Sequence, residues 1–251
     1  RRQRQMCIRD RPTAAARLPM LVITSVTGKP LIDEMILALL MPRNDHTSRR
    51  GTCVEDVFVM MERPHCLVVG VGSGTGLACV RQFVDGGYKV SMIARHEERL
   101  LSFADSTPHT MAYPSDLAEP DNYRATLRRI VDEQGLPKKV VYNAALATFQ
   151  PYSELDIDLF ERNFRGNTTG LLVTAQELAP QMVTAGDGAL IITGNTGASR
   201  GIPRFVGFSP TKASQRILAE SLARELGPQG LHIAYVVIDA MIDLSLIHIS
   251  E

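Results

Sequence analysis

The 251-residue sequence lacks net charge, because 27 lysines and arginines balance 27 aspartates and glutamates. A balanced chain creates no overall field that would draw it to nucleic acid or to an anionic membrane surface. We therefore expect a small-molecule substrate, and we expect neither nucleic acid nor a membrane as a partner.

Cysteine is scarce, and long hydrophobic runs are missing. The four cysteines form no Cys-x-x-Cys pair, and Cys66 and Cys79 lie in apolar segments, which indicates reduced core residues of a cytoplasmic protein. The longest apolar run, residues 31–41, contains Asp33 and Glu34 and is too short to span a bilayer. The six histidines include no i, i+4 pair, so we expect no metal site.

The two ends of the chain differ in pattern from the remainder. Residues 1–62 combine a basic leader with a polar, turn-rich stretch, which predicts a poorly ordered or non-native extension. The strings RQMCIRDR (residues 4–11) and LSLIHISE (residues 244–251) resemble translated sequencing-adaptor read-through, which favours a non-native tail at 244–251. An ordinary leader and an ordinary final strand are the alternatives. We place the folded, cofactor-binding domain at residues 63–243 and expect the natural protein to continue beyond Asp243.

From residue 65 onward, short β-branched runs alternate with helical stretches. Repeated βα units with nearly continuous apolar strands predict a single-domain α/β fold, a Rossmann-type doubly wound parallel sheet with helices on both faces. In such a sheet the ligand binds beyond the carboxyl ends of the strands. The expected strands are residues 66–69, 89–93, 110–113, 139–142, 189–193 and 232–238, and the expected helices are residues 75–85, 97–104, 121–134, 156–185 and 210–226.

A glycine-rich turn follows the first of these strands, where residues 67–78 read LVVGVGSGTGLA. Glycines permit positive φ angles and a close approach of a ligand, while the free N–H groups of a helix start attract an anion. The turn therefore predicts a diphosphate site, with a tight turn that binds nothing as the alternative. The candidate residues are Gly70, Gly72, Ser73, Gly74, Thr75 and Gly76.

The second strand ends in the residues Ile93-Ala94-Arg95-His96. This sequence lacks the acid that usually binds the ribose hydroxyls of NAD, and an arginine at the same place suits a 2′-phosphate. We therefore expect NADP as the cofactor, with NAD as the alternative. A solvated surface charge is the other interpretation of Arg95.

Five motifs, in the right order from Pro64 to about Ile242, resemble the short-chain dehydrogenase/reductase family. The resemblance implies hydride transfer between NAD(P) and a small carbonyl or alcohol, and it leaves open a homo-oligomer. It also implies cofactor contacts from Asp116, Leu117, Asn143, Ala144 and Lys212. The matching segments are Gly70, Gly74 and Gly76 of the turn, Asp116-Leu117, Tyr142-Asn143-Ala144-Ala145, Asn167 with Gly170, and Lys212.

Two of the four catalytic positions that the resemblance implies are altered. Phe208 replaces the tyrosine that transfers a proton, and Asn195 replaces the serine that holds the substrate carbonyl, whereas Asn167 and Lys212 are retained. Loss of a positioned acid or base typically lowers a rate by ~10²–10⁴. Four nearby residues could replace the missing proton donor: Ser209, Tyr152, Thr196 and Ser199.

Three functions remain open at this point. An NADP-dependent oxidoreductase with a degenerate tetrad comes first, and a non-catalytic NAD(P)-binding sensor or scaffold comes second. The third is a methyltransferase that uses S-adenosylmethionine. Such enzymes place acids before the first glycine and at the end of the second strand, where this chain has Val68-Val69 and Ala94.

Overall fold

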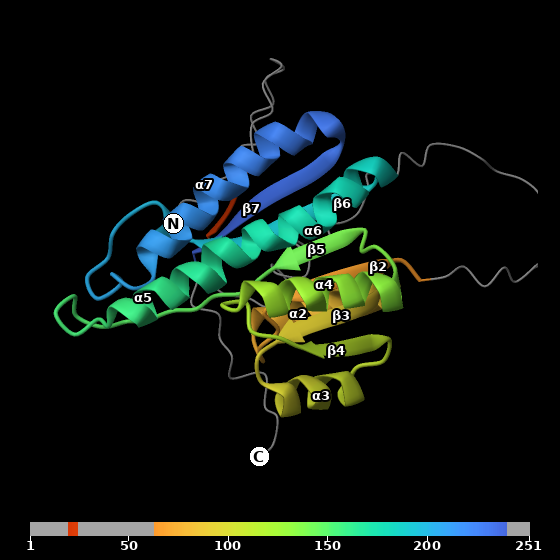
Figure 1. Ribbon diagram of the computed structural model, residues 1–251, viewed down its shortest axis with the longest axis horizontal. Helices are drawn as coiled ribbons and strands as arrows, with labels where there is room; N and C mark the ends of the chain where they lie inside the picture. The colour runs from red at the N-terminus through yellow and green to blue at the C-terminus, as the bar shows by residue number, and fades with distance from the viewer. Residues whose placement is uncertain (1–19, 25–62, 240–251) are drawn as a thin grey trace, which may run out of the picture.

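The computed structural model describes residues 20–24 and 63–239, which build one parallel sheet of seven strands (Figure 1). The strand order is β1-β7-β6-β5-β2-β3-β4. The strands are β1 (Met20–Thr24), β2 (His65–Val69), β3 (Lys89–Ala94), β4 (Thr110–Pro114), β5 (Lys139–Tyr142), β6 (Gly188–Asn195) and β7 (Leu231–Asp239). The α-helices are α2 (Thr75–Asp85), α3 (Glu97–Ser106), α4 (Pro120–Gln134), α5 (Ile157–Phe164), α6 (Gly170–Ala185) and α7 (Ser209–Leu226).

Helices cover both faces of this sheet, because successive side chains of a strand point to opposite faces. In β2, Leu67 and Val69 pack with α4, α6 and α7, while Cys66 and Val68 pack with α2 and α3. All four side chains are fully buried, which explains the continuous apolar run of this central strand. In Figure 1, α4 and α6 cross the front of the sheet. The expected doubly wound fold is therefore confirmed.

The expected elements agree with the structure to within two residues, with one exception. The expected helix 156–185 is divided into α5, a π-helical turn η1 (Arg165–Thr169) and α6. Asp156 caps α5, because its carboxylate accepts the N–H of Leu159 at 2.9 Å. A π-helical turn inserts an extra residue into a helix, often at a functional site. Here that turn carries Asn167.

Strand β1 is not among the strands that the sequence predicts, and it lies within the region 1–62. Its five residues pair in parallel with β7, from Met20 opposite Tyr235 to Thr24 opposite Asp239. The pairing covers an edge of β7 that would otherwise present free N–H and C=O groups. The rest of residues 1–62 and the expected tail 244–251 lie outside the described residues.

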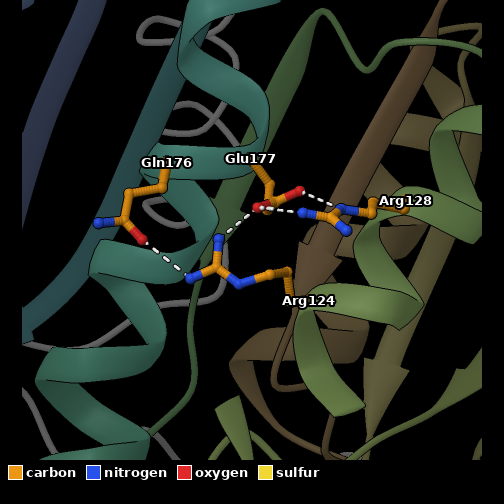
Figure 2. Close-up of polar contacts among 4 residues, drawn as sticks. All are labelled: Arg124, Arg128, Gln176 and Glu177. Carbon is orange, nitrogen blue, oxygen red and sulfur yellow. Dashed lines mark hydrogen bonds and ion pairs between the residues drawn. The ribbon is translucent and has the colours of Figure 1, made fainter. Parts of the chain in front are cut away.

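An arginine–glutamate network joins α4 to α6 at the surface, as Figure 2 shows. Arg128 donates to one carboxylate oxygen of Glu177 at 2.7 Å, and Arg124 pairs with the other oxygen. Arg124 also donates to the side-chain oxygen of Gln176 at 3.0 Å. Hydrogen bonds and charge from the two arginines, Arg128 first, lower the pKa of Glu177. Because ion pairs near the surface contribute little singly, the network adds only modestly to the packing of α4 against α6.

Two negative findings concern the part of the chain from residue 63 to residue 239. No helix in it has the length and apolar character needed to cross a membrane. It also holds no group of three or more histidine, cysteine, aspartate or glutamate side chains arranged to bind a metal ion.

Candidate functional site

The glycine-rich turn between β2 and α2 lies at the carboxyl edge of the sheet. Gly70 adopts a φ angle of +86°, and an added Cβ would lie 2.4 Å from the Cα of Ala144. An added Cβ at Gly76 would lie 2.7 Å from the carbonyl oxygen of Gly70. Gly72 differs, because an added Cβ there meets no described atom within 4 Å. Gly70 and Gly76 therefore shape the turn, and Gly72 leaves an open surface beside it.

This open surface fits the diphosphate of a dinucleotide. At the start of α2, the N–H groups of Thr75 and Gly76 have no carbonyl partner within the described residues, whereas the Leu77 N–H already donates to the Gly72 carbonyl at 3.1 Å. Ser73 is exposed, and Gly74 and Thr75 are half-buried, so this part of the loop faces outward. Uncapped N–H groups and a surface free of side chains are what an anionic diphosphate needs for close contact.

Asn143 connects the glycine-rich turn to the end of β6. Its Nδ2 donates to the carbonyl oxygen of Gly70 at 2.8 Å, and its Oδ1 accepts the hydroxyl of Thr193 at 3.0 Å. The carbonyl oxygen of Thr193 in turn accepts the amine of Lys212 at 3.0 Å. A continuous chain of polar contacts therefore runs from the glycine-rich turn to Lys212.

Arg95 and Asp116 follow neighbouring strands, β3 and β4. Burial opposes ionisation of Asp116, but the Ala118 N–H and the charge of Arg162 outweigh it, so the pKa of this carboxyl is lowered. Arg95 adds to the same effect from a distance. Arg95 is exposed, and within residues 63–239 it forms no ion pair. Leu117, the neighbour of Asp116, is buried in the core.

Asn167 is fully buried in the π-helical turn and acts as a scaffold. Its Oδ1 accepts the N–H of Leu146, and its Nδ2 donates to the Leu146 carbonyl and to the Thr211 hydroxyl, each at 2.7 Å. The side chain thus joins the loop after β5 to the first turn of α7. Its role is to place α7, and with it Lys212, against the sheet.

Lys212 is 2% exposed, and its amine points to the end of β6. The amine donates to the Thr193 carbonyl and, at 2.8 Å, to the side-chain oxygen of Gln215. An ammonium has three N–H donors, so one remains available for a ligand. Burial lowers the pKa of Lys212 to about 7. The amine therefore changes its charge close to neutral pH.

Phe208 brings an apolar ring to the position where the resemblance described above leads us to expect a proton donor. The side chain is 7% exposed, and its ring centroid lies 5.5 Å from that of Phe149 and 6.2 Å from that of Phe205. These three rings form an aromatic cluster between the loops that follow β5 and β6. Phenylalanine has no proton to transfer, so this position contributes packing alone.

Asn195, the last residue of β6, and Ser209 each hold a buried polar atom that lacks a hydrogen-bond partner among the described residues. These atoms are the Oδ1 of Asn195 and the hydroxyl oxygen of Ser209. Both atoms approach Gly197, where an added Cβ would lie 2.9 Å from the first and 3.1 Å from the second. Unpaired buried polar atoms are rare, and each calls for a partner that a ligand or a small shift supplies.

The residues considered as substitutes for the missing proton donor differ in burial and in hydrogen bonding. Tyr152 is 83% exposed. Ser199 is exposed and donates its hydroxyl to the carbonyl of Thr196 at 3.0 Å. Ser209 alone combines burial with an unpartnered hydroxyl near Asn195. Of Tyr152, Ser199 and Ser209, Ser209 therefore has the geometry closest to that of a substitute.

Comparison with known proteins decides the family. The sequence pattern described as "short chain dehydrogenase" matches residues 64–242, which is more than half of the chain. The chain belongs to the short-chain dehydrogenase/reductase family. Members of this family use NAD or NADP.

Relatives in this family match about two thirds of the chain. Carbonyl reductase [NADPH] 2 of Sus scrofa is 27% identical over 168 residues, which cover 66% of this chain and 67% of that protein. D-erythrulose reductase of Gallus gallus is 29% identical over 168 residues, with 66% and 67% covered. A solved structure of NAD⁺-bound xylitol dehydrogenase is 22% identical with a TM-score of 0.66 and covers 70% of each chain. A metagenomic short-chain oxidoreductase in complex with NADP is 19% identical with a TM-score of 0.67, covering 72% of this chain and 84% of that one.

The expected site residues of this dehydrogenase-family chain lie at one edge of the sheet. The glycine-rich turn, Arg95, Asp116 and Asn143 follow the carboxyl ends of parallel strands, and Asn195 is the last residue of β6. Sequence analysis did not single out Gln215, which contacts Lys212 directly. The feature of the sequence that could have indicated this contact is the i, i+3 spacing from Lys212, which places both side chains on one face of a helix.

Proposed function

We propose that the protein is an NADP-dependent oxidoreductase that acts on a small carbonyl or alcohol substrate. The observation that carries this proposal is the polar chain from Gly70 through Asn143 and Thr193 to Lys212. It connects a surface suited to a diphosphate with a buried amine that keeps one free donor. This arrangement supports a ligand with phosphates at one end and a hydroxyl-bearing ring at the other.

The residues present suit NADP at several points. The N–H groups at the start of α2 would hold the diphosphate, and Lys212 would bind the ribose next to the nicotinamide. The backbone at Asp116-Leu117 would flank the adenine, because the side chain of Leu117 is buried in the core. When bound, the cofactor supplies the hydride. The exposed guanidinium of Arg95 favours the 2′-phosphate, because no carboxylate follows β3 at this place. The name of the porcine relative, which includes NADPH, supports the same choice.

The chain's own residues would orient the substrate carbonyl. We infer that the side-chain amide of Asn195 donates a hydrogen bond to the carbonyl oxygen and that Lys212 holds a proton at Nζ. With Phe208 in place of a phenol, catalysis should be slow. The relatives named for reduction of D-erythrulose and L-xylulose support a carbonyl compound as the substrate class.

A second function is a non-catalytic NAD(P)-binding sensor or scaffold. The burial of Phe208 in an aromatic cluster favours it, because the cluster replaces a proton donor by packing. We also infer a cytoplasmic location from Cys66 and Cys79, which are free and buried. Burial raises the pKa of both thiols, so they stay protonated and unreactive.

The substitution Phe208→Tyr separates the two functions. Lys212 lies one helical turn away and would lower the pKa of the new phenol, so carbonyl reduction should rise by ~10²–10⁴. NADPH oxidation with a panel of aldehydes, ketones and ketoses measures the gain. Phe205→Tyr is the matched control, because it adds the same hydroxyl to the same cluster at a different position. If all three chains bind NADPH and none reduces any carbonyl, the sensor hypothesis replaces the oxidoreductase.

A further inference from the structure

The side chain of Gln215 on α7 connects the amine of Lys212 to the π-helical turn. The side chain is fully buried. Its Oε1 accepts the amine of Lys212 at 2.8 Å, and its Nε2 donates to the carbonyl oxygen of Asn167 at 2.7 Å. The amide orientation follows from these partners, because a backbone carbonyl accepts only and an ammonium donates only.

The other groups around Lys212 are neutral or directed elsewhere. On β6 the partner is the Thr193 carbonyl. On β7 the Tyr235 hydroxyl donates to the Lys212 carbonyl at 3.4 Å, and burial raises the pKa of this tyrosine, so it stays uncharged. On α7, Arg216 donates to the Ala198 carbonyl at 3.4 Å and pairs with a glutamate at 3.6 Å. The turn η2 (Thr196–Ala198) carries no ionisable side chain.

No carboxylate within residues 63–239 forms an ion pair with Lys212. The lowered pKa of this amine follows from burial alone, which disfavours the charged form when no counter-charge is present. A glutamate at position 215 could hold the amine equally well, but its charge would stabilise the ammonium. The amide of Gln215 holds the amine without that effect.

We propose that Gln215 is a positioning residue that fixes the place of the Lys212 amine through a neutral hydrogen bond and, because it brings no counter-charge, leaves the charge state of the amine to burial. An amine that gains and loses a proton near neutral pH can hold a proton in a site where Phe208 cannot. The use of this proton in catalysis rests on the proposed function. The charge state itself can be measured without cofactor.

The test compares how folding stability depends on pH, measured by urea unfolding of the full chain. Between the folded pKa of about 7 and the unfolded value of 10.5, the unfolded chain binds more protons at Lys212 than the folded chain does. The stability of the parent chain relative to Lys212→Met should therefore rise with pH from about 7 upward. Subtracting the Lys212→Met chain cancels the other titrating groups.

Gln215→Glu should move the onset of this rise upward by about 1–3 pH units, because the carboxylate stabilises the ammonium. The shift is measured against Gln215→Glu combined with Lys212→Met. Gln229→Glu is the control, because it adds the same charge at an exposed position and should leave the onset where it is. An unshifted onset would overturn the proposal. So would a Gln215→Glu chain that does not fold, because the proposal requires the ammonium to neutralise this carboxylate.

Gln215→Met tests the positioning role, because methionine keeps the volume and removes the acceptor. NADPH affinity should fall roughly five- to tenfold with loss of this hydrogen bond. An unchanged affinity would overturn the positioning role. If the parent chain does not bind NADPH at all, the proposed function fails, whereas the pH measurement still decides the role of Gln215.

Discussion

Gly70 and Gly72 lie two residues apart in one turn, yet alanine should affect them in opposite ways. At Gly70, a φ of +86° costs a side chain ~1–2 kcal/mol, and the new Cβ would collide with Ala144 at 2.4 Å. The forced shift of the Ala144 backbone adds ~1–3 kcal/mol, so we expect Gly70→Ala to lower the free energy of unfolding by about 2–5 kcal/mol.

At Gly72 the φ angle lies outside the left-handed region, and an added Cβ meets no described atom within 4 Å. Gly72→Ala should therefore leave stability nearly unchanged or raise it by ~0.4–1 kcal/mol, through the lower entropy of the unfolded chain. The methyl group would, however, fill the surface on which the diphosphate rests. A steric conflict of ~1–3 kcal/mol in the complex weakens NADPH binding roughly 5- to 150-fold.

The assay combines urea unfolding of the parent and both variants with calorimetric titration of NADPH into the parent and Gly72→Ala. The two measurements separate damage to the fold from damage to the ligand surface. A Gly72→Ala chain that is stable and binds NADPH as tightly as the parent would refute the assignment of this turn to the diphosphate. A fully stable Gly70→Ala chain would refute the geometry of the turn.

Three further outcomes are expected. Arg95→Ala should weaken NADPH binding and leave NADH binding unchanged, while the exposed control Arg99→Ala should affect neither; equal losses for both cofactors would contradict a 2′-phosphate contact. Burial lowers the pKa of His65 from 6.5 to about 4, so the imidazole of the unfolded chain is protonated at a higher pH than that of the folded chain. As the pH falls from 6.5 to about 4, about 3 kcal/mol of folding stability should therefore be lost. His65→Gln should abolish this acid-sensitive part of the unfolding curve, and an identical pH profile would contradict it. Removal of residues 1–24 should lower the urea midpoint and increase aggregation relative to removal of residues 1–19, because only the first removes β1 from the edge of β7; equal behaviour would show that this pairing contributes nothing.

The alternation of strands and helices could be predicted because each element carries its own local signal. The apolar run of β2, the glycines after it and the helical spacing of α2 are all visible within about twenty residues. The order of the motifs along the chain then placed Arg95, Asn143 and Lys212 at one edge of the sheet. Their common location follows from the parallel sheet itself, which brings the carboxyl ends of its strands to one edge.

The features that were missed depend on pairing across long distances. Nothing within Met20–Thr24 indicates that this segment lies beside β7, which is some two hundred residues later in the chain. The π-helical turn of Arg165–Thr169 divides a stretch that the sequence predicts as one continuous helix. Gln215 gains its role only because this turn presents the Asn167 carbonyl to α7.

We expect this short-chain dehydrogenase/reductase to bind NADP at the glycine-rich turn and at the amine of Lys212. Calorimetric titration of the full chain with NADPH and, separately, with NADH measures this binding. NADPH should bind saturably and more tightly than NADH. A folded chain that binds neither dinucleotide, or that binds NADH more tightly than NADPH, would contradict this expectation.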